Sequence, residues 1–480
     1  MNLNQTLQEK YPHLEVSVLK LSEVKKNIDF RIDDSFWTMK LIYNNKLNYK
    51  KIGECLLKSQ YGISINMNEG GDGIPIYRMN DIDNMLCNFE VKKYALIDKN
   101  ELQTFRLNYG DVLFNRTNSY EFVGRTGIFY NNRENFVFAS YLVRLVCNKE
   151  ILLPEYLTVF LNTHIGKKEI RRRARPSINQ TNVNPEELKE IKIPIFPMEF
   201  QLEIQNLVKD SHKALEESKE LYKKAEETLY LELGLDPKNP LQSLLDSKTN
   251  NPTKSLNISI HTLKESFLKT GRLDSEYYQK KYEINEKIIM NKKYTVLDNL
   301  VSITKSIEPG SNLYKNKGIP FIRVTNLTQY GLSEGDVFLD EKDFFPQYLQ
   351  ILYPKKDTIL FSKDGSVGIA YCVKEDKEVI TSGAILHLNI KDKENILPEY
   401  LTLFLNSIFV KLQAQRDCGG SIISHWRIED IKKVLVAILD IKIQEKIAKY
   451  IQESFNLRKK SKQLLDNAKN KVEEQIQGKI

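Results

Sequence analysis

Apolar residues recur every three to four positions in residues 199–233, a spacing that predicts one long amphipathic helix. The positions on its apolar side alternate four and three residues apart and form a heptad seam: Ile204, Val208, Ser211, Leu215, Ser218, Tyr222, Ala225 and Leu229. Charged residues fill much of the rest of the helix. A seam of this kind is stable when a second helix covers it.

A second seam of the same kind lies 243 residues further along, in residues 441–477. Its positions are Ile447, Ile451, Ser454, Arg458, Ser461, Leu465, Ala468 and Val472. The two serines and the alanine of the first seam recur, and small residues let two helix backbones approach closely. We therefore predict that the two helices pack against each other, each roughly 50 Å long at 1.5 Å per residue. The alternative is that each helix lies on its own domain.

Other motifs also occur twice, in the same order and displaced by 241 to 247 residues. Arg31 and Asp33 in FRIDDSFW correspond to Arg272 and Asp274 in GRLDSEYY. Three further pairs follow in the same order: GIPIYRMNDI with GIPFIRVTNL, GDVLFNRTNSYEFVGRTGIFY with KDTILFSKDGSVGIAYCV, and LPEYLTVFLN with LPEYLTLFLN. Chance does not preserve both order and spacing across so many motifs, so the chain is a tandem duplication.

Each repeat predicts a mixed α+β domain, with short strands between Gly, Asn and Asp turns and a helix at LPEYL. We place a first domain at 1–198 and the first long helix at 199–233. A linker rich in Pro, Asn and Ser follows at 234–256, then a second domain at 257–440 and the second long helix at 441–477.

Composition is that of a globular protein of 480 residues, with 41% hydrophobic and 28% charged residues. No apolar run approaches the roughly 20 residues that span a bilayer, so we expect a cytoplasmic protein. The five cysteines are scattered and predict neither a disulfide framework nor a zinc site, and we expect no metal. A net charge of +8 permits a polyanionic partner if the excess is concentrated.

Enzyme motifs for phosphate, dinucleotide or zinc chemistry are missing from the sequence, as are those of adenine methyltransferases and nucleases. We therefore expect no catalytic residues. The glycine-rich segment 70–73 has no helix after it and is interpreted as a plain turn.

A basic segment, KKEIRRRARPSINQ, is the first candidate for nucleic-acid contact, although such runs often form a solvated face. Arginine binds phosphates or guanine through its planar fork, and Asn and Gln can pair with adenine. The candidates here are Arg171, Arg172, Arg173, Arg175, Ser177, Asn179 and Gln180.

The same framework position in the second repeat carries different polar residues, as two different base sequences would require: Gln415, Arg416, Ser421, Ser424 and His425. Turns after the repeated Leu-Phe strands add Asn115, Arg116, Thr117 and Asn118, and Ser362, Lys363 and Ser366. The Gly-Ile-Pro motifs add Arg78 and Asn80, and Arg323, Thr325 and Asn326. For the two arginines of these motifs a structural ion pair is the alternative.

Together these motifs resemble the DNA-specificity subunit of type I restriction–modification enzymes, over nearly the whole chain. The resemblance is carried by GIPFIRVTNL, ILFSKDGSVGIA, LPEYLTLFLN and KIQEKIAKYI and by their first-half counterparts. It implies two target-recognition domains separated by two long antiparallel helices, which form a coiled-coil spacer. It also implies a two-part double-stranded DNA target, with one domain reading each part.

The resemblance further implies that this subunit binds DNA without catalysing a reaction. Two methyltransferase subunits would dock along the helices, and restriction subunits would complete the enzyme. S-adenosylmethionine, ATP and Mg would belong to those partners, leaving no cofactor here. One departure concerns the second junction: members commonly have prolines before the long helix, whereas this chain has VAILDIKIQ there.

Three other functions remain open on the sequence. One is a self-sufficient methyltransferase or nuclease, which the missing motifs disfavour and which purified protein with DNA and a methyl donor would test. The chain could be the recognition subunit of a two-component type IIB- or IIG-like restriction–methylation enzyme, which a pull-down of partners would distinguish. It could instead be an adaptor that holds proteins in paired domains, in which case binding would be insensitive to DNA and salt.

Overall fold

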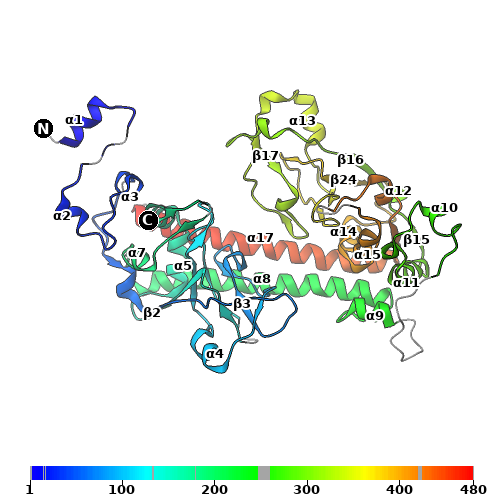
Figure 1. Cartoon of the computed structure of the whole chain (residues 1–480), viewed down its shortest axis with the longest axis horizontal. Coiled ribbons are helices and arrows are strands. Elements are labelled where there is room, and N and C mark those ends of the chain that lie inside the picture. Colours follow the sequence, from blue (N-terminus) through cyan, green and yellow to red (C-terminus); the bar gives the residue numbers. More distant parts are fainter. Residues whose placement is uncertain are drawn as a thin grey trace. The chain divides into compact units, whose positions relative to one another are not determined.

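The computed structural model describes residues 3–14, 16, 18–39, 41–131, 135–178, 180–246, 260–419 and 424–478. The chain divides into two compact units, which are described separately. Unit 1 is Met1–Glu216 with Arg458–Ile480, and unit 2 is Glu217–Leu457. Each unit contains one repeat together with part of each long helix (Figure 1).

The main sheet of unit 1 has the strand order β2-β11-β7-β9-β5-β4. Its strands are β2 (Leu56–Tyr61), β4 (Ile82–Asp83), β5 (Leu86–Cys87), β7 (Val112–Asn115), β9 (Thr126–Ile128) and β11 (Leu142–Cys147). Smaller sheets are formed by β1 (Tyr49–Lys51) with β14 (Lys192–Pro194), by β3 (Ile74–Tyr77) with β6 (Tyr94–Ala95) and β10 (Val137–Phe138), and by β8 (Thr117–Asn118) with β12 (Arg175–Pro176) and β13 (Thr181–Asn182). These short strands agree with the mixed fold predicted from the turn-rich sequence.

Helices of unit 1 lie at both ends of the repeat and between its strands. They are α1 (Leu3–Lys10), α2 (Leu21–Val24), α3 (Asp34–Thr38), α4 (Lys99–Phe105), α5 (Pro154–Asn162), α6 (His164–Arg173) and α7 (Pro185–Lys189), with 3₁₀ turns η1 (Ile52–Cys55) and η2 (Met79–Asp81). Helix α5 is the LPEYL helix, begins at the predicted proline and is buried over nearly its whole length. It contacts β9 and belongs to the hydrophobic core of the unit.

Unit 2 repeats this arrangement. Its main sheet has the order β16-β24-β21-β22, formed by β16 (Val301–Lys305), β21 (Ile359–Ser362), β22 (Ala370–Cys372) and β24 (Ile385–Ile390). The smaller sheets are β15 (Tyr294–Val296) with β25 (Leu435–Ala437), β17 (Ile319–Ile322) with β20 (Phe338–Leu339) and β23 (Ile380–Thr381), and β18 (Leu327–Thr328) with β19 (Gly331–Leu332). Its helices are α9 (Pro240–Asp246), α10 (Phe267–Thr270), α11 (Lys280–Met290), α12 (Leu297–Leu300), α13 (Pro346–Leu352), α14 (Pro398–Asn406), α15 (Ile408–Asp417) and α16 (Ile428–Ile431), with 3₁₀ turns η3 (Ser275–Tyr278), η4 (Ser311–Leu313), η5 (Val324–Asn326) and η6 (Glu341–Asp343).

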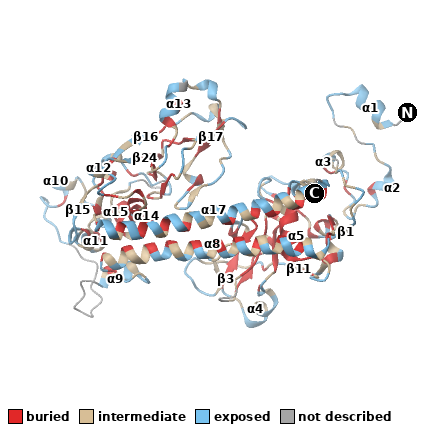
Figure 2. Ribbon diagram, turned by 180° about the vertical axis from the view of Figure 1, so that it is seen from behind, coloured by how far each residue is buried: buried red, intermediate tan, exposed pale blue. Residues whose placement is uncertain are grey.

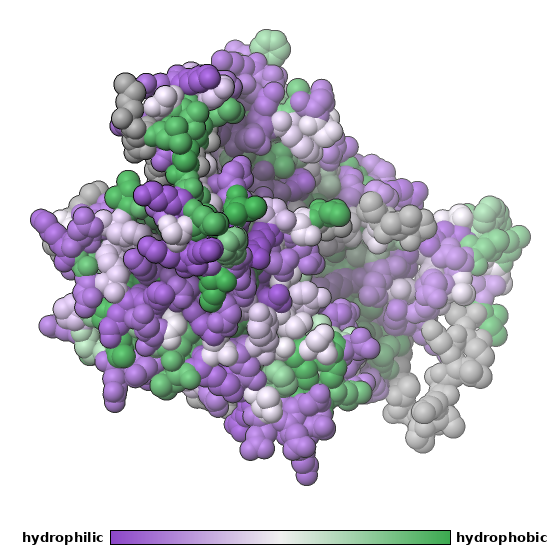
Figure 3. Space-filling view, turned by 60° about the vertical axis from the view of Figure 1, so that its left-hand side comes forward, coloured by the Kyte–Doolittle hydropathy of each residue, from purple (hydrophilic) through white to green (hydrophobic). Residues whose placement is uncertain are grey.

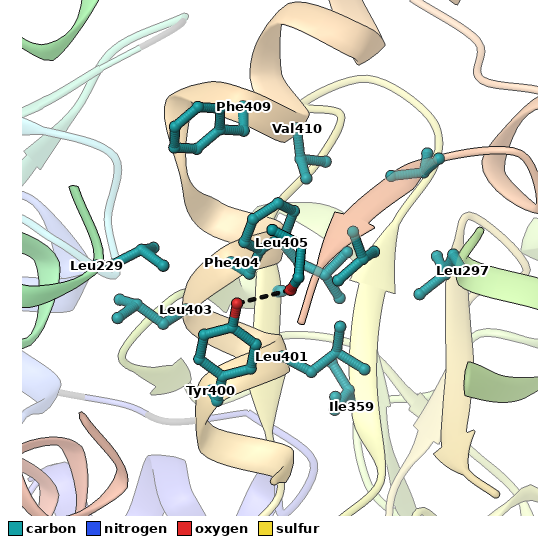
Figure 4. Packing of buried hydrophobic residues seen from close by; sticks show 14 of the residues in the cluster. Leu229, Leu297, Ile359, Tyr400, Leu401, Leu403, Phe404, Leu405, Phe409 and Val410 are labelled. Atoms are coloured by element: carbon teal, nitrogen blue, oxygen red, sulfur yellow. Dashed lines mark hydrogen bonds between the residues drawn. The ribbon is translucent and has the colours of Figure 1, made fainter. Parts of the chain in front are cut away.

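Helix α14 is the second LPEYL helix and lies at the centre of the hydrophobic core of unit 2. Tyr400, Leu401 and Phe404 point from it into a cluster that Ile359 of β21 and Leu229 also join (Figure 4). The hydroxyl of Tyr400 donates a hydrogen bond of 2.7 Å to the carbonyl oxygen of Ala437. In unit 1 Tyr156 makes the equivalent bond to Pro194, at 2.8 Å. The near-identical LPEYL sequences therefore have the same packing role in both units.

The long helices are α8 (Met198–Glu232) and α17 (Ile441–Gln477), close to the predicted bounds. In unit 1 the hydroxyl of Ser211 lies 2.8 Å from that of Ser461. Lys471 forms an ion pair with Glu203, at 2.7 Å between Nζ and Oε1. An earlier residue of α8 thus faces a later residue of α17, so the helices run antiparallel. The predicted pairing is confirmed.

The same contact recurs in unit 2, where the hydroxyls of Ser218 and Ser454 lie 2.9 Å apart. Ser454 also donates to the carbonyl oxygen of Ser218, at 2.7 Å, so the backbones approach closely at this layer. Seam residues that are buried in the helix pair recur along both helices (Figure 2): Ile204, Val208, Ser211, Ser218, Tyr222, Ala225, Leu229, Ile447, Ile451, Ser454, Ser461, Leu465, Ala468 and Val472. Leu215 and Arg458 are half-buried.

A buried glutamine fixes each long helix to its own domain. In unit 1 the side-chain oxygen of Gln201 accepts from the amide of Leu153 at 2.9 Å, and its amide donates to the carbonyl oxygens of Ile151 and Phe196. Gln444 makes the equivalent three bonds in unit 2. The second junction, whose sequence VAILDIKIQ has no proline, is therefore held by the same side-chain contacts as the first.

No helix among the described residues has the length and apolar character needed to cross a membrane. The face shown in Figure 3 is mostly hydrophilic, with apolar side chains in scattered patches.

Candidate nucleic-acid interface

Several loops of unit 1 meet at one end of its main sheet. Strand β3 ends beside residues 139–141, because the amide of Ala139 donates to the carbonyl oxygen of Tyr77 at 2.9 Å. Strand β7 ends at the same place, because the amide of Arg116 donates to the carbonyl oxygen of Tyr141 at 3.0 Å. The guanidinium of Arg116 also donates to the carbonyl oxygen of Ser140, at 3.3 Å. The Gly-Ile-Pro motif and the turn after the Leu-Phe strand are thus neighbours in space.

The segment after the basic helix joins the same end of the sheet. Strand β12 pairs with β13, and β13 pairs with β8, with Thr181 opposite Asn118. The hydroxyl of Thr117 donates to the side-chain oxygen of Asn182 at 2.6 Å. Two sets of candidates that are some 60 residues apart in sequence therefore form one surface. We call residues 78–80, 115–119, 139–141, 175–178 and 180–182 the loop face of unit 1.

Unit 2 builds the same surface from different residues. The amide of Ser382 donates to the carbonyl oxygen of Ile322 at 2.9 Å, and that of Lys363 donates to the carbonyl oxygen of Ala384 at 2.8 Å. Isolated bridges join His425 to Asp364 and to Gly419, in place of the three short strands of unit 1. The loop face of unit 2 comprises residues 323–325, 362–366, 382–384, 418–419 and 424–425.

This paired architecture agrees with a known family. The family model described as "Type I restriction modification DNA specificity domain" matches residues 64–227 and 291–469, and so covers both repeats. The chain belongs to this family. Its two matched regions each contain a loop face and the start of a long helix.

Individual relatives are similar over part of their length. The protein provisionally designated the specificity subunit of type I restriction enzyme MjaX of Methanocaldococcus jannaschii is 30% identical over 151 residues, 31% of this chain and 35% of that protein. The type I restriction enzyme EcoKI specificity subunit of Escherichia coli K12 is 27% identical over 161 residues, 33% of this chain and 34% of that protein. The chain thus matches about a third of the length of these relatives.

Solved structures of similar proteins include the S subunit of a type I restriction–modification system from M. genitalium. It is 15% identical and covers 90% of this chain and 96% of its own, with a TM-score of 0.40.

The arginine run, predicted as one contact patch, is divided by the fold of this specificity-family chain. Arg171 and Arg175 are exposed, with Arg171 lying 5.7 Å from the ring of Tyr120. Arg173 is buried and forms an ion pair with Glu169. Arg172 is half-buried and donates to the carbonyl oxygen of Phe36 at 2.6 Å. Burial, together with the charge of Arg173, lowers the pKa of Arg172. Arg172 and Arg173 therefore have structural partners. The guanidinium of Arg175 also pairs with Asp29 and lies 3.4 Å from Glu187, although its side chain is exposed. DNA contact by Arg171 and Arg175 stays a prediction.

Other candidates of unit 1 also separate by exposure. Ser177, Gln180 and Asn80 are exposed, and Arg116 and Asn118 are half-buried. Asn115 and Thr117 are buried, so the structure gives them supporting roles in place of the predicted contact with DNA. Arg78 is half-buried, 3.8 Å from Asp81, which matches the ion-pair alternative. Asn179 lies outside the described residues.

In unit 2 the exposed candidates are Thr325, Ser366, Gln415, Ser424 and His425. Lys363 is half-buried and pairs with Asp364, whose carboxylate also lies 2.9 Å from Nδ1 of His425. Arg323 makes an ion pair with Asp336 at 2.7 Å. Ser421 lies outside the described residues.

Three candidates of unit 2 have structural roles instead of the predicted DNA contact. Buried Ser362 donates to the carbonyl oxygen of Ser366 at 2.6 Å, which closes the turn. Buried Asn326 accepts from the amide of Arg323 at 3.0 Å. Arg416 pairs with Asp417 and Glu286; burial tends to lower its pKa, but bonding to these carboxylates raises the pKa overall.

The sequence did not predict that residues 139–141 form part of the loop face of unit 1, or that two tyrosines lie beside it. Tyr61 ends β2 and lies 5.1 Å from the guanidinium carbon of Arg116, and Tyr120 lies beside Arg171. Both rings are partly exposed next to the loop face. Their positions at strand and turn ends gave no repeated motif to identify them.

Metal ligation has no support in the described part of the chain, where no cluster of three or more His, Cys, Asp or Glu side chains could hold an ion.

Proposed function

We propose that this chain is the DNA-binding specificity subunit of a type I restriction–modification enzyme and carries out no catalysis itself. Each unit would read one half of a two-part target through its loop face. The observation that supports this most directly is the repeated loop face itself. The backbone contacts are equivalent in the two units, whereas the exposed side chains differ.

The exposed chemistry of each loop face fits DNA. Arg175 on the loop face of unit 1, and Arg171 on the helix α6 that leads into it, are suited to phosphates, whose contacts supply affinity independent of sequence. Ser177 and Gln180 carry hydroxyl and amide groups that can pair with base edges. His425 and its neighbours give unit 2 a different set of donors and acceptors, so we infer that the two half-sites differ in sequence.

Family membership supports the remaining partners. We propose that two methyltransferase subunits and the restriction subunits bind this chain in the cytoplasm, with the methyltransferases docking along α8 and α17. S-adenosylmethionine, ATP and Mg would then act in those partners.

The direct test uses the purified full chain, alone and with its methyltransferase subunits, and a pool of DNA duplexes with a randomised segment. Retained duplexes are sequenced. We expect two short blocks of preferred bases separated by a spacer without preference. A retained pool with no preferred base at any position would refute the proposal, as would binding that salt does not weaken.

Charge removal tests the two exposed arginines on and next to the loop face of unit 1. The double variant Arg171→Ala and Arg175→Ala should weaken DNA binding and reduce the slope of log affinity against log salt by about 2, roughly one unit for each phosphate that is no longer neutralised. The matched control is Lys58→Ala with Lys149→Ala. These lysines are also exposed, but they lie toward the other end of β2 and β11, away from Tyr61 and Tyr141. Equal slopes of log affinity against log salt in the two double variants would show that the arginines do not contact DNA and belong to a solvated surface.

A further inference from the structure

The Arg-x-Asp motif near the start of each repeat contacts the helix that leads into the loop face. In unit 1 Arg31 donates to both carboxylate oxygens of Asp33, at 2.7 and 2.6 Å. Its remaining nitrogen donates to the carbonyl oxygen of Arg173 at 2.9 Å, at the last residue of α6. One guanidinium therefore joins the motif to the end of the basic helix, 142 residues away in sequence.

Unit 2 has a corresponding contact, one residue earlier in its helix. Arg272 donates to the two oxygens of Asp274 at 2.8 and 2.6 Å. It also donates to the carbonyl oxygen of Arg416 at 3.2 Å, in the last turn of α15. The contact therefore recurs although the residues that follow the two helices differ.

An aromatic ring completes the contact in each unit. The ring of Phe36 has the guanidinium carbons of Arg31 and Arg172 at 4.8 and 4.3 Å. The ring of Tyr277 has those of Arg272 and Arg416 at 4.7 and 5.4 Å. We call these four residues of each unit the arginine clamp. In unit 1 they are Arg31, Asp33, Phe36 and Arg172, and in unit 2 they are Arg272, Asp274, Tyr277 and Arg416.

The clamp acts at a place where the backbone needs partners. The last carbonyl groups of a helix have no donor within it, and a positive charge there also complements the helix dipole. In unit 1 the chain leaves α6 through Ala174 and enters β12 at once. In unit 2 Cys418 follows α15, and Gly419 then bridges to His425. The position of each helix end thus sets where the following loop begins.

We infer that the arginine clamp positions the loop face, and so controls base preference without contacting DNA. This inference rests on the proposed function. The positioning residues are Arg31 and Asp33 in unit 1, and Arg272 and Asp274 in unit 2. Each pair holds the end of the helix that precedes the loop face of its own unit. Binding groups must be held within about 0.5 Å of their productive positions, so release of one helix end should weaken discrimination in one half-site.

The sharper test is in unit 2, because the side chain of Arg272 is 32% exposed and that of Asp274 is 44% exposed. Removal of Arg272 therefore leaves no deeply buried charge. We expect Arg272→Ala to reduce base preference by about 10-fold in one block of the target selected from the randomised duplexes, while the other block is unchanged. Arg31→Ala should affect the opposite block.

Two further variants separate positioning from charge. Arg272→Lys retains the positive charge but cannot form the fork with Asp274 and reach Arg416 together, so it should behave like Arg272→Ala. Lys393→Ala is the matched control, since it also removes one surface cation of unit 2, which pairs with Asp357 at 2.7 Å. It should select the same sequences as the unaltered chain.

The results distinguish the two proposals. Failure of the unaltered chain to select any sequence would refute the proposed function. Selection by the unaltered chain, with both blocks intact in Arg272→Ala, would overturn the clamp alone. Equal weakening of both blocks would also overturn it, because a general loss of folding affects both units. Full preference in Arg272→Lys would show that the charge acts on DNA directly and would overturn it as well.

Discussion

Replacement of Gln444 by leucine tests how the second domain is fixed to its long helix. The glutamine is fully buried, and its side chain bonds three backbone groups. It accepts from the amide of Leu397 at 3.0 Å and donates to the carbonyl oxygens of Asn395 and Leu439 at 3.1 and 2.9 Å. Leucine has a similar volume but cannot make these bonds.

The expected cost follows from those bonds. A typical intramolecular hydrogen bond contributes about 1 kcal/mol, so three bonds correspond to about 3 kcal/mol. The cost rises further if the buried amide of Leu397 finds no other partner, because a buried unsatisfied donor costs about 1–3 kcal/mol. We therefore expect Gln444→Leu to lower the free energy of unfolding by about 3 kcal/mol or more.

Urea unfolding of the full chain measures this change, and faster exchange of the Leu397 amide hydrogen would localise it. The matched control is Gln452→Leu on the same helix. Gln452 is exposed and bonds Glu399 at 3.0 Å, so its loss should cost under about 0.5 kcal/mol. Equal losses in the two variants would refute the reasoning, since burial of the bonded groups would then be irrelevant.

Two other predictions concern the helix pair and a buried histidine. Ser454→Ala should cost about 1–2 kcal/mol, because it removes the donor to the carbonyl oxygen of Ser218 and leaves the buried Ser218 hydroxyl without its Ser454 partner. Adding Ser218→Ala removes that hydroxyl as well, so the double change should cost less than the sum of the two single changes; additive costs in urea unfolding would contradict this. His387 is buried, and burial lowers its pKa to about 4. Its side chain lies 2.8 Å from the hydroxyl of Thr381. The unfolded chain binds a proton at this position below about pH 6.5 and the folded chain does not, so stability is lost as the pH falls from 6.5 toward 4. The loss should reach about 2 kcal/mol at pH 5 and be absent in His387→Gln, and a variant with an unchanged pH dependence would disprove it.

The repeated contacts explain how one scaffold can serve two sequences. Gln201 and Gln444 bond equivalent backbone groups, and each arginine clamp bonds a carbonyl oxygen in the last turn of the helix that precedes its loop face. Residues that face solvent beyond this framework, such as Gln180 and His425, differ freely between the units. Exchange of exposed residues therefore changes the surface chemistry at little cost to the packing beneath it.

Sequence alone determined the duplication, the LPEYL helices and both long helices with their seam. These features follow from local periodicity and repeated motifs, which are written along the chain. The pairing of the seams was also predictable, because small residues such as Ser211 and Ser461 occur where the helices must approach closely.

Tertiary structure decided which polar residues reach the surface. Arg171 and Arg173 are two positions apart in one basic run, yet Arg171 is exposed whereas Arg173 is buried against Glu169. It also decided that Gln444 holds a helix junction and that Arg31 holds the end of α6. The physical reason is that burial and hydrogen bonding depend on partners distant in sequence, whose positions are fixed when the sheets and helices pack.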